Sequence, residues 1–140
     1  MRIVLDTNVL VAGLLNPFGP CGEIVRMVSA GDLILLWDAR VLAEYADVLA
    51  RPKFNFDPVK IRVLLDFSRH YGLACGSIPL AVRLPDPDDE PFLEVAAAGR
   101  ADALVTGILS HFPSAPPLPV PVLPPAGFLA FYRERLAGER

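Results

Sequence analysis

RIVLDTN, residues 2–8 of the chain, begins with a short, mostly apolar run with β-branched residues at positions 2–5. The carboxylate of Asp6 ends this run. An uninterrupted apolar run of this length predicts a strand that is buried on both faces. Strands of that kind belong to parallel sheets that helices cover on both sides. Asp6 follows the predicted strand directly and therefore lies at its carboxyl end, where ligands collect in open α/β sheets.

Working outward from this strand, strand-like and helix-like segments alternate along the chain. Further strands are predicted at residues 33–37, 73–75, 103–106 and 120–123. Helices are predicted at residues 9–15, 21–29, 38–50, 58–71, 88–98 and 125–136, the third of them capped by Asp38. The alternation predicts an α/β fold with a parallel sheet covered by helices on both faces. No repeat or linker interrupts it, so residues 1–140 are predicted to form a single domain.

Length, composition and charge narrow the function classes. The chain has 140 residues, 53% of them hydrophobic, which suffices for a core without disulfides. A net charge of −3 argues against a large nonspecific nucleic-acid surface, but a nuclease can neutralise phosphate locally with metal ions. Cys21 and Cys75 form no metal-binding motif and are expected to be buried apolar residues. Neither a signal peptide nor an apolar stretch near the ~18 residues of a membrane span is visible, so a cytoplasmic protein without membrane contact is expected.

Glu44 is the acidic residue whose helical position is most informative. It lies three residues after Val41 and four before Val48, so it borders the apolar stripe of its predicted helix. A carboxylate at such a boundary needs a polar partner. Either a divalent cation or solvent at the helix edge can be that partner.

Asp6 and the acidic run at residues 86–90 each allow two interpretations. Asp6 either caps the helix that follows it or binds a ligand, and the acidic run is either a helix first turn favoured by the dipole or part of a metal site. Carboxylates that converge without histidine or cysteine suit Mg²⁺ or Mn²⁺. Such a cation lowers the pKa of a bound water and stabilises charge on a phosphoryl group. The chemistry predicted on this basis is phosphodiester hydrolysis.

Four motifs in order carry a resemblance to a known family. Residues 3–10 (IVLDTNVL), 41–45 (VLAEY), 86–96 (DPDDEPFLEVA) and 101–107 (ADALVTG, followed by HFP at 111–113) resemble the four motifs of PIN domains. Within that family the chain is similar to the VapC toxins of toxin–antitoxin pairs. The resemblance implies a three-layer α/β/α sandwich with a parallel sheet of about five strands. It also implies a Mg²⁺- or Mn²⁺-dependent endoribonuclease with an RNA substrate, an antitoxin protein as partner, and a homodimer.

The resemblance also assigns roles by position. Asp6, Glu44 and Asp89 are the expected catalytic carboxylates and metal ligands, and Thr106 and Asn8 are expected to orient ligands or phosphate. Asp89 is preferred over its neighbours Asp86 and Asp88. The reason is its register at the start of a predicted helix, with apolar residues following at i+3, i+4 and i+7 (Phe92, Leu93 and Ala96).

Ile108 is the one departure from the family pattern. Many PIN domains carry an acid there, two residues after the threonine of the fourth motif, whereas isoleucine ligates nothing. A weakened PIN domain that binds RNA or a protein without cleavage therefore stays open as an alternative. His111 is expected to pack in a loop or cap a helix rather than join the acids. The first two helices offer either a dimer face or core packing through Leu14, Leu15, Ile24 and Val28.

Overall fold

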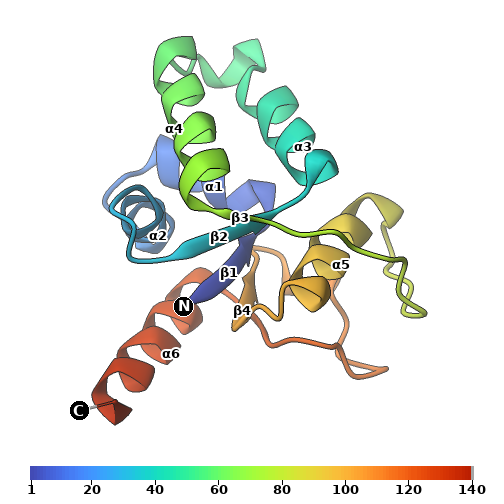
Figure 1. Ribbon diagram of the computed structural model, residues 1–140. Helices are drawn as coiled ribbons and strands as arrows, with labels where there is room; N and C mark the ends of the chain where they lie inside the picture. The colour runs from blue at the N-terminus through green and yellow to red at the C-terminus, as the bar shows by residue number, and fades with distance from the viewer. Residues whose placement is uncertain (140) are drawn as a thin grey trace.

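A five-stranded parallel sheet forms the centre of the protein, in a computed structural model that describes residues 1–139. The strands lie in the order β3-β2-β1-β4-β5, so β1 is central and its neighbours come from distant parts of the chain (Figure 1). Their bounds are β1 (Arg2–Leu5), β2 (Ile34–Trp37), β3 (Leu73–Ala74), β4 (Ala103–Val105) and β5 (Val122–Leu123). All four pairings are parallel, which confirms the predicted sheet.

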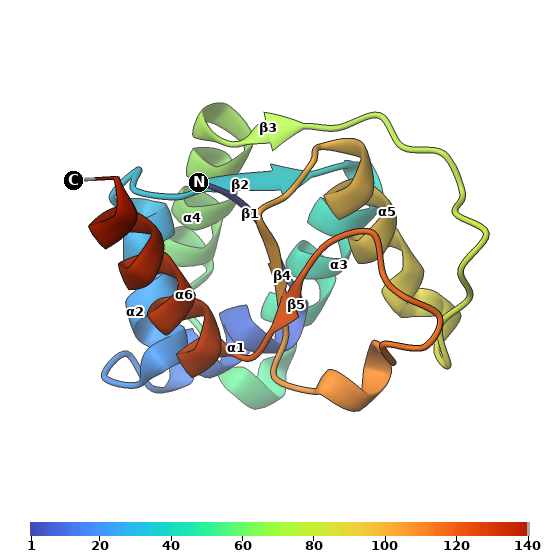
Figure 2. The ribbon, with the colours of Figure 1, turned by 90° about the horizontal axis from the view of Figure 1, so that it is seen from below.

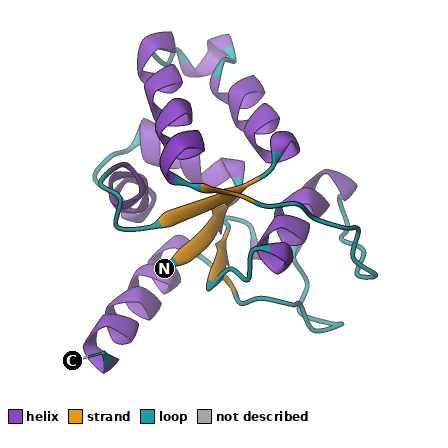
Figure 3. Ribbon diagram, in the orientation of Figure 1, coloured by secondary structure: helices purple, strands orange, loops and turns teal. Residues whose placement is uncertain are grey.

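Helices cover both faces of this sheet, as the three-layer prediction requires. They are α1 (Thr7–Leu15), α2 (Pro20–Ser29), α3 (Ala39–Leu49), α4 (Pro58–Tyr71), α5 (Glu90–Ala98) and α6 (Pro125–Gly138). Seen from below, α2, α4 and α6 lie on one side of the strands and α5 on the other (Figure 2). This division follows from the strand order, because the chain crosses back over β2 and β1 between β3 and β4. Figure 3 shows how much of the remaining chain, notably the stretch between β3 and α5, is loop.

The core sits where the central strands meet the helices. Ile3, Val4 and Leu5 of β1 are completely buried, as a strand covered on both faces must be. Tyr45 of α3 is also completely buried, and its hydroxyl donates a hydrogen bond to the backbone carbonyl of Leu5. That bond ties α3 to the carboxyl end of β1, immediately before Asp6.

Several sequence-based boundaries and burial expectations need correction. The last strand is Val122–Leu123 and not residues 120–123, because Pro121 has no N–H to donate to a sheet ladder. Ile24 and Val28 are buried in the core, so they form no dimer face. Both cysteines are only partly buried. In residues 1–139, no helix combines the length and the apolar character that crossing a membrane would take.

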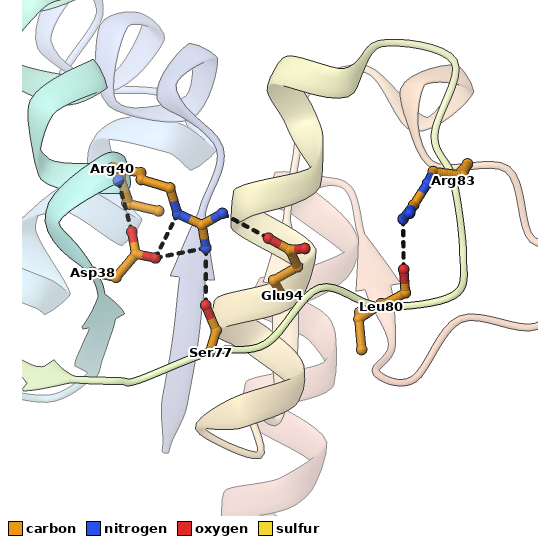
Figure 4. A network of polar contacts seen from close by, with 7 residues as sticks. Asp38, Arg40, Ser77, Leu80, Arg83 and Glu94 are labelled. Atoms are coloured by element: carbon orange, nitrogen blue, oxygen red, sulfur yellow. Dashed lines mark hydrogen bonds and ion pairs between the residues drawn. The ribbon is translucent and has the colours of Figure 1, made fainter.

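Arg40, in the first turn of α3, connects that helix to α5 (Figure 4). Its guanidinium contacts the carboxylate of Glu94 at 2.7 Å and that of Asp38 at 2.7 Å, and it donates to the hydroxyl of Ser77 at 2.8 Å. Glu94 is buried, with 7% of its surface exposed, so Arg40 is the cation that permits its burial. The contact matters for the site described below, because α3 carries Glu44 and α5 follows Asp89.

Replacing Arg40 by alanine is expected to lower the free energy of unfolding by about 1–3 kcal/mol, because the buried Glu94 carboxylate loses its partner. Urea unfolding followed by circular dichroism measures this change. Arg83→Ala is the matched control, since the Arg83 side chain reaches only the carbonyl of Leu80 in its own loop (Figure 4). A loss no larger than the control's would contradict the prediction, and adding Glu94→Gln should recover part of it.

Candidate active site

Asp6 lies at the carboxyl end of the central strand, and two neighbours fix its carboxylate. The Thr106 hydroxyl, at the end of β4, donates to Oδ2 of Asp6 at 2.9 Å, and the Asn8 side-chain amide donates to the same oxygen at 3.0 Å. Asp6 precedes α1 but makes no capping hydrogen bond to it, so the capping interpretation is wrong. Burial raises the pKa of Asp6, and its hydrogen bonds to Thr106 and Asn8 oppose that rise.

Thr106 and Asn8 also hold the loop that follows β4. The Thr106 hydroxyl accepts a hydrogen bond from the Ile108 backbone N–H at 3.1 Å, and the side-chain Oδ1 of Asn8 accepts one from the Gly107 backbone N–H at 2.9 Å. Each residue thus bonds both Asp6 and the loop, Thr106 through its single hydroxyl and Asn8 through the nitrogen and the oxygen of its side-chain amide. This is the arrangement expected of residues that orient a ligand-binding carboxylate.

Glu44 approaches Asp6 from α3, on the side of β1 toward β2. The Thr7 hydroxyl donates a hydrogen bond to its carboxylate, so Glu44 is held inward and does not extend freely into solvent. Burial raises the pKa of Glu44, and the negative charges of Asp6 and Asp88 raise it further against the Thr7 hydrogen bond. Glu44 borders the apolar stripe of its helix and was expected to need a polar partner. The Thr7 hydroxyl is one such partner.

Asp89 reaches the same place from the short 3-10 helix η2 (Pro87–Asp89), at the start of α5. Its neighbours differ in role, because Asp86 accepts a hydrogen bond from the Asp88 backbone N–H and caps η2, while Asp88 itself is exposed. Burial, and then the negative charge of Asp6, raise the pKa of Asp89 to about 6. Its Oδ2 is buried and accepts no hydrogen bond within the described residues.

His111 joins these acids, contrary to the expectation that it packs elsewhere. It ends the 3-10 helix η3 (Leu109–His111), and its Nδ1 lies 3.3 Å from Oδ2 of Asp89. The backbone N–H of His111 donates to the Ile108 carbonyl at 3.1 Å, and this turn brings the chain back toward the site. A single 3-10 turn has no hydrophobic periodicity, so only the nearness of His111 to the fourth motif hinted at its position.

These side chains line one open groove with a volume of about 450 Å³. Its acidic side is formed by the three carboxylates and His111. Arg51, after α3, and Phe54 of the 3-10 helix η1 (Pro52–Phe54) also line the groove. The structure thus brings together, at the carboxyl edge of the sheet, Asp6, Glu44, Asp89, Asn8 and the Thr106 that supports Asp6.

The donor chemistry of this groove fits a hard divalent cation. Three carboxylates whose pKa values are all raised share one groove, and the Oδ2 of Asp89 has no hydrogen-bond donor of its own. A cation would relieve both the mutual repulsion and the missing contact. Across residues 1–139, no three acidic, histidine or cysteine side chains are gathered around one point. Asp6 and Glu44 are instead held by hydroxyl and amide donors.

Ile108 contributes no ligand to the groove. Its side chain is 41% exposed, and only its backbone N–H takes part in the site, through Thr106. Asp102, the other acid near β4, lies at the opposite end of that strand, where it accepts a hydrogen bond from the Arg2 N–H. Among the residues that the structure describes, Asp102 therefore does not take the place of the acid that PIN domains commonly carry at position 108.

Comparisons with known proteins agree with this architecture. The family description "PIN domain" matches residues 2–107. No curated protein matches the sequence significantly. Among solved structures, one similar chain belongs to the VapBC2 complex from Rickettsia felis bound to a DNA fragment from their promoter. It has a TM-score of 0.54 and 13% identity, and the match covers 89% of this chain and 98% of that one. At that identity the likeness concerns the fold, while the family match spans most of the chain, so the protein belongs to the PIN-domain family.

Proposed function

We propose that this protein is a metal-dependent endoribonuclease and the toxin of a type II toxin–antitoxin pair. The observation that carries the proposal is the groove that Asp6, Glu44 and Asp89 line together, with the buried Oδ2 of Asp89 lacking a hydrogen-bond donor. Membership of the PIN family supports hydrolysis of phosphodiester bonds. RNA is the proposed substrate, and the cytoplasm is the proposed site of action.

The three carboxylates would hold Mg²⁺ or Mn²⁺, with Asp6 oriented by Thr106 and Asn8. When bound, the cation supplies positive charge against the scissile phosphate and makes water a stronger nucleophile. The chain itself supplies the buried, pre-oriented carboxylates and keeps Asp6 in one rotamer through two hydrogen bonds. In the same groove, the exposed Arg51 is available to contact a phosphate and Phe54 to stack on a base.

The antitoxin and a second copy of the chain are the proposed partners. The solved relative was crystallised as a VapBC2 complex, which supports an antitoxin. An apolar groove of about 510 Å³ between α3 and α4 shares Arg51 with the acidic groove and offers a surface next to the site. For the homodimer, exposed apolar side chains such as Phe18, Val59 and Val63 are available.

Cleavage of a mixed RNA pool tests the proposal. The wild type is expected to cut RNA with Mn²⁺ or Mg²⁺, to stop in EDTA, and to lose activity as Asp6→Asn. Equal cleavage by both proteins, or none from the wild type at any metal concentration, would overturn the ribonuclease assignment. Ile108 favours the second candidate, a PIN domain that binds RNA or a protein without cutting. That candidate predicts RNA retention in a filter-binding assay with no metal-dependent cleavage.

Thr106→Val is expected to lower kcat/KM for RNA about 10- to 100-fold, the range seen when a residue that orients a metal ligand is lost. Valine fills the fully buried position but removes the hydroxyl that bonds Asp6 and the Ile108 N–H. Thr106→Ser keeps that hydroxyl and should retain most activity. Steady-state cleavage of a fluorescent RNA measures the difference, and equal rates for the two variants would argue against an orienting role.

A further inference from the structure

The family resemblance assigns no role to His111, although its side chain lines the groove together with the acids. It lies three residues after Ile108, the position where a fourth acid is common, and its Nδ1 reaches 3.3 Å from Oδ2 of Asp89. The side chain of Asp89 is 13% exposed and that of His111 41%, so the imidazole covers the buried carboxylate while keeping one edge toward the groove. The His111 side chain therefore lies at the rim of the proposed metal site.

The contact between His111 and Asp89 lacks the geometry of a hydrogen bond. Although Nδ1 and Oδ2 are only 3.3 Å apart, Oδ2 accepts no hydrogen bond within the described residues. Neighbouring ligands of one octahedral Mg²⁺ or Mn²⁺ ion lie about 3 Å apart, since each bond is about 2.1 Å and the bonds meet at right angles. Two donor atoms at this separation, with no hydrogen bond between them, therefore have the spacing of two ligands of one ion.

We propose that His111 supplies the fourth protein ligand of the metal site, in place of the acid that Ile108 replaces. This inference rests on the proposed function, because it assumes a cation among Asp6, Glu44 and Asp89. Mg²⁺ prefers oxygen ligands, whereas imidazole nitrogen is favoured by ions later in the transition series. A nitrogen ligand therefore makes the site prefer Mn²⁺ over Mg²⁺ more strongly than three carboxylates alone would.

A simple ion pair between His111 and Asp89 is the competing explanation, and it predicts the opposite change in affinity. If His111 is a ligand, removing the imidazole weakens Mn²⁺ binding. If His111 is instead an imidazolium ion that occupies Asp89, the cation must displace it. Removing the imidazole would then strengthen Mn²⁺ binding or leave it unchanged.

Mn²⁺ and Mg²⁺ titrations of the full chain, followed by calorimetry, separate these explanations. His111→Phe is expected to weaken Mn²⁺ binding at least about tenfold and Mg²⁺ binding less, so the preference for Mn²⁺ falls. His70→Ala is the matched control, because the chain has 2 histidines and His70 is exposed on α4, outside the groove. Pulsed electron paramagnetic resonance of the Mn²⁺ complex should detect an imidazole nitrogen in the wild type and His70→Ala, and none in His111→Phe.

Unchanged or tighter Mn²⁺ binding by His111→Phe, or a wild-type complex without a nitrogen signal, would overturn the proposal. Either result leaves the ribonuclease assignment standing, because the carboxylates still bind the ion. A wild type that binds no Mn²⁺ at all would overturn the proposal together with the metal-dependent function. Circular dichroism of each variant shows whether it is folded, and His111→Asp gives a second variant that supplies an oxygen ligand. That variant should bind Mg²⁺ more tightly than His111→Phe does.

Discussion

Replacing Asp89 by asparagine is expected to lower kcat/KM for RNA cleavage about a thousandfold, which corresponds to about 4 kcal/mol of transition-state stabilisation. Asparagine keeps the size of the side chain but removes the charge that a divalent cation requires. It also leaves the fold intact, because Asp89 makes no capping hydrogen bond to α5. Single-turnover cleavage of a defined RNA with saturating Mn²⁺ measures the loss.

Asp88→Asn is the matched control for this prediction. It changes the adjacent acid, which is exposed and whose backbone N–H, unchanged by the substitution, donates to Asp86. Its rate is expected to stay within about twofold of the wild type, as for a surface substitution that leaves the transition state untouched. An equal loss in both variants would mean that the acidic run acts through its total charge and that Asp89 has no special position.

Replacing Asp89 by asparagine is also expected to stabilise the protein when metal is absent. The pKa of Asp89 is raised from 3.8 to about 6, so the folded protein holds this proton more tightly than the unfolded chain does. Stability then falls as the pH rises through the window from 3.8 to about 6 and stays lower above it. Above that window Asp89→Asn should be more stable than the wild type by about 2 kcal/mol, since it carries no buried charge.

Thermal unfolding in EDTA between pH 4 and pH 8 tests this expectation. The difference between the two proteins isolates Asp89 from every other carboxylate, and it should be small at pH 4 and largest at pH 8. Saturating Mn²⁺ should reverse the order, because only the wild type gains the full binding free energy of the ion. If Asp89→Asn is less stable than the wild type in EDTA at pH 8, the burial and repulsion argued for this carboxylate are wrong.

The fold was predictable because its strongest signals are local. The apolar run at residues 2–5 matches β1 residue for residue, and Asp38 caps α3 through the Val41 N–H as expected. The end of the sheet was less predictable, since the prolines around Val120 remove donors and leave a strand of 2 residues. Elements that are determined by hydrophobic periodicity or by a capping residue could therefore be predicted from their own sequence.

The candidate site was only partly predictable, because contacts across the sheet have no local signal. Asp6 and Glu44 could be nominated from their positions after a strand and beside an apolar stripe, and their catalytic roles stay a prediction. The partner of Glu94 is Arg40, 54 residues away, and no local sequence pattern in either segment predicts the pairing. His111 depends on a 3-10 turn that follows a loop whose backbone N–H groups, at Gly107 and Ile108, donate to the side chains of Asn8 and Thr106.

The central place of β1 also has a consequence for the time at which the site forms during synthesis. Ile3 pairs with Ala103, so the strand that carries Asp6 is completed on one side only by a segment made about 100 residues later. At ribosomal rates of about 5–20 residues per second, roughly 5–20 seconds separate the two. Until then Asp6 lacks the Thr106 hydroxyl that orients it, and His111 has not been made. Under the proposed function, an interrupted or truncated chain would leave cellular RNA intact, and the harmful activity would arise only as the last third of the protein folds.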